Sequence, residues 1–397
     1  MSRSIRSRVI AVTATALGLG ALVVLSSATQ AAAVGSVPVL GHVPSTPLYD
    51  VGVHGTLTNA GMRNATAAFS PLHFTTTVKD GANTYTDVMV GKNPSKRTRN
   101  GLATIKTLLV PLIINFSNGD TWDPTTTDSC DAGGSALART QNSPIFVSQP
   151  WTWGGTPIGT GQVTDAFQRA EFWTYAQPTG VDPTYGVQLA LTTVRTVTIN
   201  VPTADAAAAT GVPCGNGLLG LVEINWLDSY LRTTVIPSLA SQGLTARTLP
   251  IFLLHNVAEY IGTTSQCCVL GYHSAYAPSA GVIQTYGLSM YDNSSLFTGS
   301  GDVSALSHEV GEWQNDPYGT NSTLPWGHVG QVTACQGNLE VGDPLSGTTF
   351  ADPVGGFTYH PQELAFYSWF YHQSPSLGVN GWYSDRGTFT TSAAHCP

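Results

Sequence analysis

"LSHEVGEWQNDP", residues 306–317, predicts the helix on which both the fold and the candidate site depend. At about 100° per residue, four apolar positions fall within an arc of about 80° and would face a core: Val303, Leu306, Val310 and Trp313. His308 and Glu312 lie one turn apart on the opposite side. Asp302 or Ser304 can cap the start of the helix. Pro317 ends it at Asp316, because proline disfavours helical geometry in the residue before it.

The charge on this segment distinguishes it from most surface helices. It carries four ionisable side chains and no Lys or Arg: His308, Glu309, Glu312 and Asp316. Carboxylates that cluster beside a histidine repel one another unless a bound cation compensates. The segment therefore predicts a metal site. The alternative is an ordinary surface helix that exposes its charged face to water.

The order of these side chains indicates which role each would take. In the H-E-x-x-H pattern of zinc peptidases, two histidines one turn apart bind the ion, and the glutamate between them acts as base. Here Glu312 stands in the place of the second histidine, so the pattern is H-E-x-x-E. We expect His308 and Glu312 to bind a metal ion and Glu309 to act as the general base.

A third protein ligand must come from elsewhere in the chain. In a straight helix Asp316 would lie about 12 Å along the axis from His308, too far to share one ion. The downstream stretch "GNLEVGDPLSG" (337–347) offers carboxylates, of which we expect Glu340 to be the third ligand. The alternative third ligands are Asp343, Asp316 if the chain folds back at Pro317, and His328.

Hydrophobic patterning around this helix predicts a mixture of strands and helices. Buried or alternating runs predict strands at 104–116, 187–201 and 248–257, and helical spacing predicts helices at 164–176, 220–240 and 360–375. We therefore expect one α+β domain over residues 101–397. Residues 34–100 are rich in Gly, Thr, Pro and Asn, which favours an extended or β-rich N-terminal region.

Composition and the N-terminus bound the class of protein. A basic start, an apolar stretch and a small-residue site before Ala33 predict a signal peptide over residues 1–33, and so an exported protein that leaves the membrane after cleavage. Of the 397 residues, 42% are hydrophobic and 10% charged, enough to build a large core. A net charge of -8 with 16 Lys and Arg argues against a nucleic-acid partner.

The cysteines and one tryptophan-rich loop each allow a simple interpretation. Six cysteines in an exported chain predict disulfides rather than a zinc site, and we expect the adjacent Cys267 and Cys268 to take separate partners because a bond between neighbours strains the geometry. The loop "QPWTWGGTPIGTG" (149–161) is either an aromatic platform for a sugar or peptide, or an edge of the core in which both Trp are buried.

Three motifs, in this order, resemble the plant exordium, or phosphate-induced, proteins and their secreted bacterial relatives. They are "CCVLGYHSAYAP" (267–278), "LSHEVGEWQNDP" (306–317) and "LEVGDP" (339–344). That family shows a Cys-then-G-[FY]-H segment, an H-E-x-x-E helix followed by [ND]-P, and an E-[IV]-[AG]-D segment. The resemblance covers roughly residues 248–345. The helix motif is also similar to that of the zincin metallopeptidases.

The resemblance implies a zincin-like α+β fold, with a mixed sheet beside an active-site helix. It also implies that His308 and Glu312 occupy metal positions, that Glu309 is the base, and that Glu340 or Asp343 is the last ligand. His273 matches the histidine of the first motif, and we expect it to bind substrate.

These observations predict a secreted metal-dependent hydrolase, peptidase-like, that acts on a peptide or cell-wall substrate. One imidazole and two carboxylates would hold one divalent ion, with zinc favoured, and harder ions such as manganese or calcium are alternatives. A noncatalytic secreted or cell-wall-associated binding protein with a structural ion is the second hypothesis. A glycosidase comes third, because its carboxylates normally face each other across the substrate.

Overall fold

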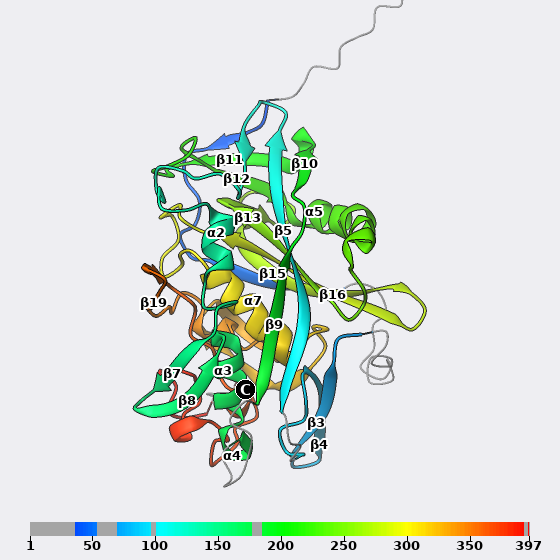
Figure 1. Cartoon of the computed structure of the whole chain (residues 1–397), viewed down its shortest axis with the longest axis vertical. Coiled ribbons are helices and arrows are strands. Elements are labelled where there is room, and N and C mark those ends of the chain that lie inside the picture. Colours follow the sequence, from blue (N-terminus) through cyan, green and yellow to red (C-terminus); the bar gives the residue numbers. More distant parts are fainter. Residues whose placement is uncertain (1–35, 54–69, 97–100, 177–184, 393–395, 397) are drawn as a thin grey trace, which may run out of the picture. The chain divides into compact units, whose positions relative to one another are not determined.

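The computed structural model describes residues 36–53, 70–96, 101–176, 185–392 and 396 (Figure 1). The expected signal peptide, residues 1–33, lies outside the described residues. In the part of the chain that is described, no helix is long and apolar enough to cross a membrane.

Twelve strands form one mixed sheet, with the order β1-β11-β12-β14-β15-β16-β13-β5-β10; β2 pairs with β15, and β6 and β9 pair with β5. Its strands are β1 (Val39–Leu40), β2 (Leu48–Val53), β5 (Leu102–Phe116), β6 (Thr121–Trp122), β9 (Gly186–Thr193), β10 (Val197–Val201), β11 (Ala206–Thr210), β12 (Leu218–Glu223), β13 (Leu249–His255), β14 (Val257–Tyr260), β15 (Cys267–Ser279) and β16 (Val282–Tyr291).

Four hairpins and a few short helices surround this sheet. The hairpins are β3 (His73–Asp80) with β4 (Asn83–Val90), β7 (Gln149–Trp153) with β8 (Thr156–Gly161), β17 (Ser322–Val329) with β18 (Val332–Asn338), and β19 (Asp352–Val354) with β20 (Phe357–Tyr359). The helices are α2 (Ala136–Gln141), α3 (Val163–Glu171), α4 (Trp173–Ala176), α5 (Ile224–Tyr230), α6 (Ile236–Ser238), α7 (Ser304–Asn315) and α8 (Tyr367–Phe370).

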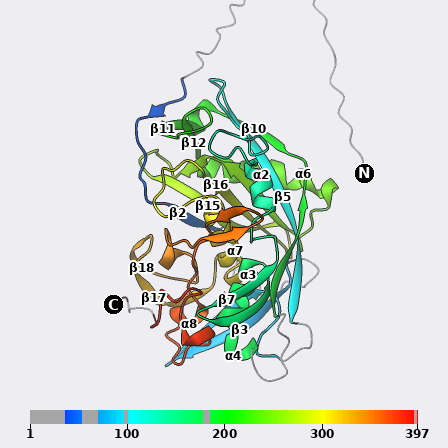
Figure 2. The same ribbon diagram turned by 60° about the vertical axis from the view of Figure 1, so that its left-hand side comes forward.

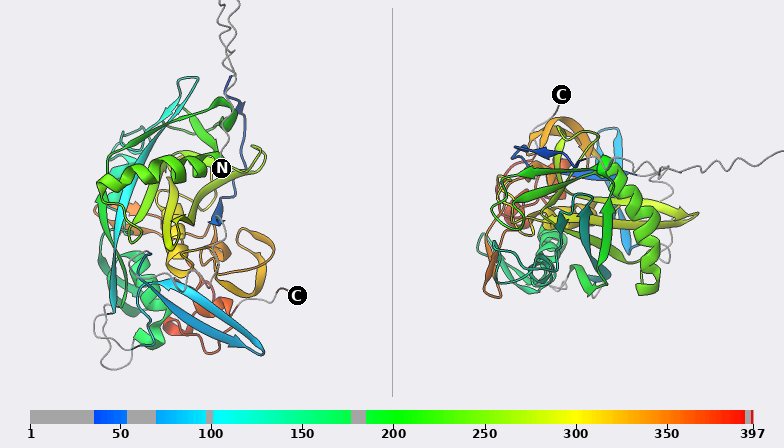
Figure 3. Two further views of the ribbon diagram at one scale, coloured as in Figure 1. Left: turned by 90° about the vertical axis from the view of Figure 1, so that its right-hand side faces the viewer. Right: turned by 90° about the horizontal axis from the view of Figure 1, so that it is seen from above.

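The central strands of the sheet are buried on both faces, which explains their nearly continuous apolar sequences. In β13, Leu249, Ile251 and Leu253 face a core that also contains Val310 and Trp313 of α7. Phe252 and Leu254 alternate with them and face a second core, which includes residues of α5. Helix α7 packs against β15 and β16 (Figure 1, Figure 2), and the α5–α6 segment lies alongside the sheet (Figure 3).

The prediction of an α+β, zincin-like fold is wrong. Strand accounts for 41% of the structure and helix for 19%, and the large mixed sheet makes the protein β-rich. Two segments that helical spacing favoured account for part of the difference. Residues 218–223, at the start of the expected 220–240 helix, form strand β12, and only Tyr367–Phe370 is α-helical within 360–375. In apolar runs that are buried on every side, periodicity does not separate strand from helix.

The remaining local predictions have mixed outcomes. The strands expected at 104–116 and 248–257 and the helix expected at 164–176 are present as β5, β13 and α3 with α4. The strand expected at 187–201 is two strands, β9 and β10. The described parts of the 34–100 region form β1 to β4, and two of these strands join the main sheet by pairing with β11 and β15. That region therefore helps to build the surroundings of α7.

The cysteines form three disulfides: Cys130–Cys214, Cys267–Cys268 and Cys335–Cys396. The prediction of disulfides is confirmed, but the expectation that Cys267 and Cys268 take separate partners is wrong. These two neighbours are bonded to each other across a cis peptide bond at the start of β15.

The tryptophan-rich stretch is the β7–β8 hairpin, and its two indoles are part of the core. Trp151 and Trp153 are buried and lie edge-on to each other. The interpretation as a core edge is therefore confirmed, and the interpretation as an exposed aromatic platform is wrong.

Candidate metal centre

Helix α7 supplies three of the candidate side chains and is buried along its whole length. It begins at Ser304 and ends at Asn315, with Asp316 as its C-cap, as Pro317 predicts. The expected caps are wrong, because Val303 is the N-cap and makes no side-chain cap hydrogen bond. Burial also excludes the alternative of a surface helix with a solvated charged face. The ionisable side chains of α7 therefore need partners inside the protein.

His308, Glu312 and Asp343 form the first cluster of candidate ligands. His308 Nε2 lies 3.0 Å from Glu312 Oε1 and 3.6 Å from Asp343 Oδ1. One donor atom from each of the three residues lies within 4.8 Å of the others. In a tetrahedral zinc site with bonds of about 2.0–2.1 Å, neighbouring donor atoms are about 3.3 Å apart. The spacing of this cluster therefore fits a shared cation.

The ring of His308 is held in one orientation from three directions. Its Nδ1 lies against the side-chain amide of Gln362, at 3.2 Å from Oε1 and 2.9 Å from Nε2, while Gln362 Nε2 donates to Gly342 O. Tyr49 stacks on one face of the ring, and Gly342 touches the ring closely enough that a Cβ there would lie 2.5 Å from Nδ1. A proton on Nδ1 that is donated to Gln362 leaves the lone pair of Nε2 free to bind an ion.

His308 Nε2 is itself an orphaned atom. It is buried and has no well-aligned hydrogen-bond partner in the described part of the chain, although Glu312 Oε1 is only 3.0 Å away. Two atoms that approach each other closely without the geometry of a hydrogen bond are typical of two ligands of one ion. This orphaned nitrogen supports the fit of a cation to the cluster.

Glu312 is bound by backbone groups as well as by its neighbours. Its Oε1 accepts hydrogen bonds from the backbone N–H of Gly342 at 3.1 Å and of Asp343 at 3.3 Å. Burial by itself raises the pKa of Glu312, but the neighbouring imidazoles of His308 and His273 outweigh it, and the net pKa lies below the usual value. Glu312 is therefore held as a carboxylate, the form that binds metal ions.

Asp343 is fixed by amides on the other side of the cluster. Gln331 Nε2 donates to Asp343 Oδ1, and Gln336 Nε2 donates to Oδ2 at 3.1 Å. Gln331 also makes hydrogen bonds with both backbone groups of Tyr49, so its side chain connects strand β2 to Asp343. Burial, followed by the charge of Glu312, raises the pKa of Asp343 well above its usual value.

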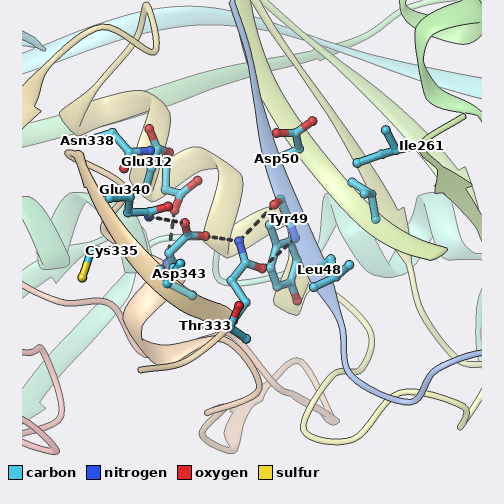
Figure 4. A pocket seen from close by; sticks show the side chains of 15 residues that line it. Leu48, Tyr49, Asp50, Ile261, Glu312, Thr333, Cys335, Asn338, Glu340 and Asp343 are labelled. Carbon is cyan, nitrogen blue, oxygen red and sulfur yellow. Dashed lines mark hydrogen bonds between the residues drawn. The ribbon is translucent and has the colours of Figure 1, made fainter. Parts of the chain in front are cut away.

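An open cavity of about 340 Å³ lies against this cluster. Glu312, Glu340 and Asp343 line one side of it, and Leu48, Tyr49 and Asp50 of β2 line the other (Figure 4). Residues of strand β18 complete the wall. The candidate cation position is thus next to a space that a substrate group or water can enter.

Glu340 lines the cavity without contributing to the first cluster. Its two side-chain oxygens are buried and have no hydrogen-bond partner among the described residues. Burial, and then repulsion from Glu312, Asp316 and Asp343, raises the pKa of Glu340 well above its usual value. The structure thus brings both expected carboxylates of the 337–347 segment to the site, but Asp343 is the one grouped with His308 and Glu312.

His273 and Glu309 form a second group with Glu312 on the side of α7 that faces β15. His273 Nδ1 lies 3.3 Å from Glu309 Oε2 and 3.6 Å from Glu312 Oε2. Burial lowers the pKa of His273 to about 4, whereas burial and the charge of Glu312 raise the pKa of Glu309 well above its usual value. Neither residue is part of the lining of the open cavity.

The other two candidates lie outside both groups. Asp316 uses its carboxylate to accept hydrogen bonds from the backbone N–H of Thr320 and Asn321, each at 2.9 Å. His328 is exposed on β17, and Cys335 and Cys396 beside it are joined in a disulfide. The structure thus brings Asp316 and His328 to other positions.

Three residues around His308 and Asp343 were not expected from the sequence. Tyr49, Gln331 and Gln362 come from segments far apart in the chain, and none belongs to a recognisable motif. Tyr49 reaches the site because β2 pairs with β15 across more than two hundred residues. Such pairing leaves no local signal in the sequence.

Comparison with known proteins leaves the resemblance to the exordium-like proteins as a prediction. No family model, no curated protein and no solved structure matches the chain.

Proposed function

We propose that this protein is an exported, metal-dependent hydrolase that acts on peptide bonds. The observation that supports this most directly is the convergence of His308, Glu312 and Asp343 within 4.8 Å of one another beside an open cavity of about 340 Å³. Metal-dependent hydrolysis requires both a site for the ion and access for a substrate, and in this protein the candidate ligands lie beside the cavity.

His308, Glu312 and Asp343 would hold one divalent cation, and zinc suits a donor set of one imidazole and two carboxylates. Manganese and calcium are alternatives because carboxylates also suit harder ions. When bound, such an ion polarises a substrate carbonyl and makes its water more acidic. The two carboxylates neutralise most of the ionic charge, so this water would be less acidic than at a site with three histidines.

The chain's own acid–base group would then be Glu340. We expected Glu309 to take this role, but Glu309 faces His273 and does not line the cavity, whereas Glu340 does. A buried carboxyl group with a raised pKa exchanges its proton closer to neutral pH than an ordinary glutamate does. Glu340 would accept a proton from the attacking water and return it to the leaving amine, so that one water is consumed for each bond cleaved.

Strand β18 supports a peptide as the substrate class. It lines the cavity and, within the described residues, pairs only with β17. Residues 333–335 of this strand are exposed. A strand with one free edge can pair with an extended peptide through main-chain hydrogen bonds. A peptide of the cell wall would meet the same requirement.

Export is supported by the N-terminal sequence and by the cysteines. The leader pattern of residues 1–33 is typical of a signal peptide, and the described cysteines are all in disulfides, which persist in oxidising compartments.

A noncatalytic protein with a structural ion is the second candidate. The burial of the ligands favours it, because His308, Glu312 and Asp343 are 0%, 1% and 7% exposed. In this case the ion would stabilise the packing of the 339–345 segment on α7. Removal of the metal would then lower stability, while no variant would alter a hydrolytic rate.

Metal content tests the proposal first. The purified protein is dialysed against Zn²⁺ and then against metal-free buffer, and its bound metal is measured by mass spectrometry. We expect wild-type protein to retain zinc and His308→Ala to lose the ion that it binds. His328→Ala, which removes an exposed histidine on β17, is the matched control and should retain as much zinc as wild type. Wild-type protein without bound metal would overturn the proposal.

Hydrolysis of a mixture of fluorescence-quenched peptides then separates the two candidates. Glu340→Gln should keep its zinc and lose activity by about 10²–10⁴-fold, the usual contribution of a general acid–base group. If the wild-type protein holds zinc but cleaves no peptide in the mixture, the structural ion is the better account.

A further inference from the structure

We infer that the centre holds two cations, with Glu312 as a bridge between them. The second position is formed by His273, Glu309 and Glu312, whose donor atoms all lie within 4.8 Å of one another. This inference rests on the first cation position proposed above, and it assigns Glu309 and His273 as ligands rather than as base and substrate-binding group.

The orientation of His273 determines which of its ring nitrogens carries the proton. His273 is fully buried, and its Nε2 lies 3.0 Å from the backbone carbonyl of Asp316, which can only accept a hydrogen bond. The proton of the neutral ring is therefore on Nε2. The lone pair of Nδ1 then points toward two carboxyl groups, at 3.3 Å from Glu309 and 3.6 Å from Glu312. A lone pair facing acceptors needs a proton or a cation between them.

His308 also directs one ring nitrogen toward two carboxyl groups, because its Nε2 lies 3.0 Å from Glu312 and 3.6 Å from Asp343. Its Nδ1 lies against the amide of Gln362, at 3.2 Å from Oε1 and 2.9 Å from Nε2. Two histidines from different elements, β15 and α7, thus each direct one ring nitrogen toward two carboxyl groups. Glu312 lies between them, with Oε1 toward His308 and Oε2 toward His273. One carboxylate with an oxygen directed to each of two positions is the usual bridge in a two-metal site.

Glu309 is directed to the second position by close packing. It is 2% exposed, and its Oε1 is buried and has no hydrogen-bond partner in the described part of the chain. A Cβ at Gly271 would lie 2.9 Å from Glu309 Cγ, so the absence of a side chain in β15 makes room for this carboxyl group. The carboxyl group of Glu309 therefore fits beside His273, while Glu309 Oε1 has no hydrogen-bond partner among the described residues.

Charge also favours two ions over one. Glu309, Glu312, Glu340 and Asp343 surround the two imidazoles, and among the described residues none of the four forms an ion pair with Lys or Arg. One divalent ion balances two of these carboxylates, and the other two must then keep a proton or stay uncompensated in a buried site. Two divalent ions balance the four carboxylates.

A proton is the competitor for the second position. In metal-free protein, a protonated Glu309 can donate to His273 Nδ1 and satisfy both residues. A cation would displace this proton, so the number of bound ions decides between the two occupants.

The test counts ions in the full protein and does not depend on activity. We expect the wild-type protein to bind two equivalents of Zn²⁺ at saturation, as measured by titration calorimetry and by mass spectrometry after dialysis. Glu309→Gln, which keeps the size of the side chain, should bind one equivalent, and Glu312→Gln should lose both. One equivalent in the wild type overturns the inference but leaves the proposed function intact, whereas no bound zinc overturns both. Two equivalents in Glu309→Gln would place the second ion elsewhere and also overturn the inference.

A second measurement avoids any variant that folds poorly. Two Mn²⁺ ions bridged by one carboxylate couple magnetically, so wild-type protein saturated with Mn²⁺ should not show the hyperfine pattern of an isolated Mn²⁺ ion in its electron paramagnetic resonance spectrum. A spectrum of isolated Mn²⁺ at saturation would contradict the shared bridge.

Discussion

The ring of Tyr49 stacks on the ring of His308, with the centroids 3.8 Å apart and the planes 22° apart. Tyr49 belongs to β2, which pairs with β15, the strand that carries His273. A strand near the N-terminus therefore covers one face of a candidate ligand. It also forms part of the wall of the open cavity.

Replacement of Tyr49 should affect both stability and metal affinity. Tyr49→Ala removes a buried ring, which costs about 3–5 kcal/mol of unfolding free energy, and it frees His308 to rotate. Tyr49→Phe keeps the stack and should bind Zn²⁺ as wild type does. Urea unfolding and zinc titration measure the two effects. Equal zinc affinity in Tyr49→Ala and Tyr49→Phe would show that the stack does not position His308.

Gln331 should position Asp343 without binding the ion. Its amide bonds Asp343 Oδ1 and both backbone groups of Tyr49. Outer hydrogen bonds of this type commonly contribute 10–100-fold to metal affinity, so we expect Gln331→Ala to weaken zinc binding by about that factor. Gln266→Ala, at an exposed position before β15, is the control. A zinc affinity unchanged by Gln331→Ala would indicate that Gln336 alone holds Asp343.

The sequence predicts the local part of the site well. The spacing of apolar residues and Pro317 predicts where α7 ends, and the separation of four residues places His308 beside Glu312. The segment 337–347 also brings Glu340 and Asp343 close to the side chains of α7. Which of them joins His308 depends on the path of the loop, because Gly342 and Asp343 turn their N–H groups toward Glu312. That path is set by tertiary contacts.

The prediction of the fold class is wrong for a related reason, because tertiary contacts also decide which segments are strands. Strand β12 runs directly into α5 at Ile224, so a segment that is strand and then helix has the apolar spacing of one helix. The pairing of β2 with β15, and the position of Gln362 against His308, join parts of the chain that share no local pattern. A short motif therefore predicted the helix and the proximity of His308 and Glu312, but not the sheet that surrounds the helix.

Glu171 should make the protein less stable as the pH rises. Burial raises its pKa from 4.5 to about 8, even though the backbone N–H of Tyr367 donates to it at 2.7 Å. Between these two values the folded protein binds a proton that the unfolded chain has released. The free energy of unfolding therefore falls as the pH rises through this range.

Glu171→Gln removes this proton, so its urea midpoint should change less than that of wild type between about pH 5 and pH 8. Asp80→Asn, in the exposed turn of the β3–β4 hairpin, should keep the wild-type profile. Identical profiles for Glu171→Gln and wild type would show that Glu171 is ionised in the folded protein throughout this range.

Zinc binding should require glycine at position 342 because a side chain there would meet the His308 ring, and not because of the backbone conformation of Gly342. Its φ of -85° and ψ of -35° suit any residue, but a Cβ there would lie 2.5 to 2.6 Å from three atoms of the His308 ring. Gly342→Ala should therefore push the ring away from Glu312 and Asp343 and lower zinc affinity. Gly337→Ala is the matched control, because its Cβ would meet its nearest neighbour, Thr323 O, at 3.5 Å. If both variants bind zinc with wild-type affinity, the His308 ring is not held where the cluster needs it, and the first cation position loses its main support.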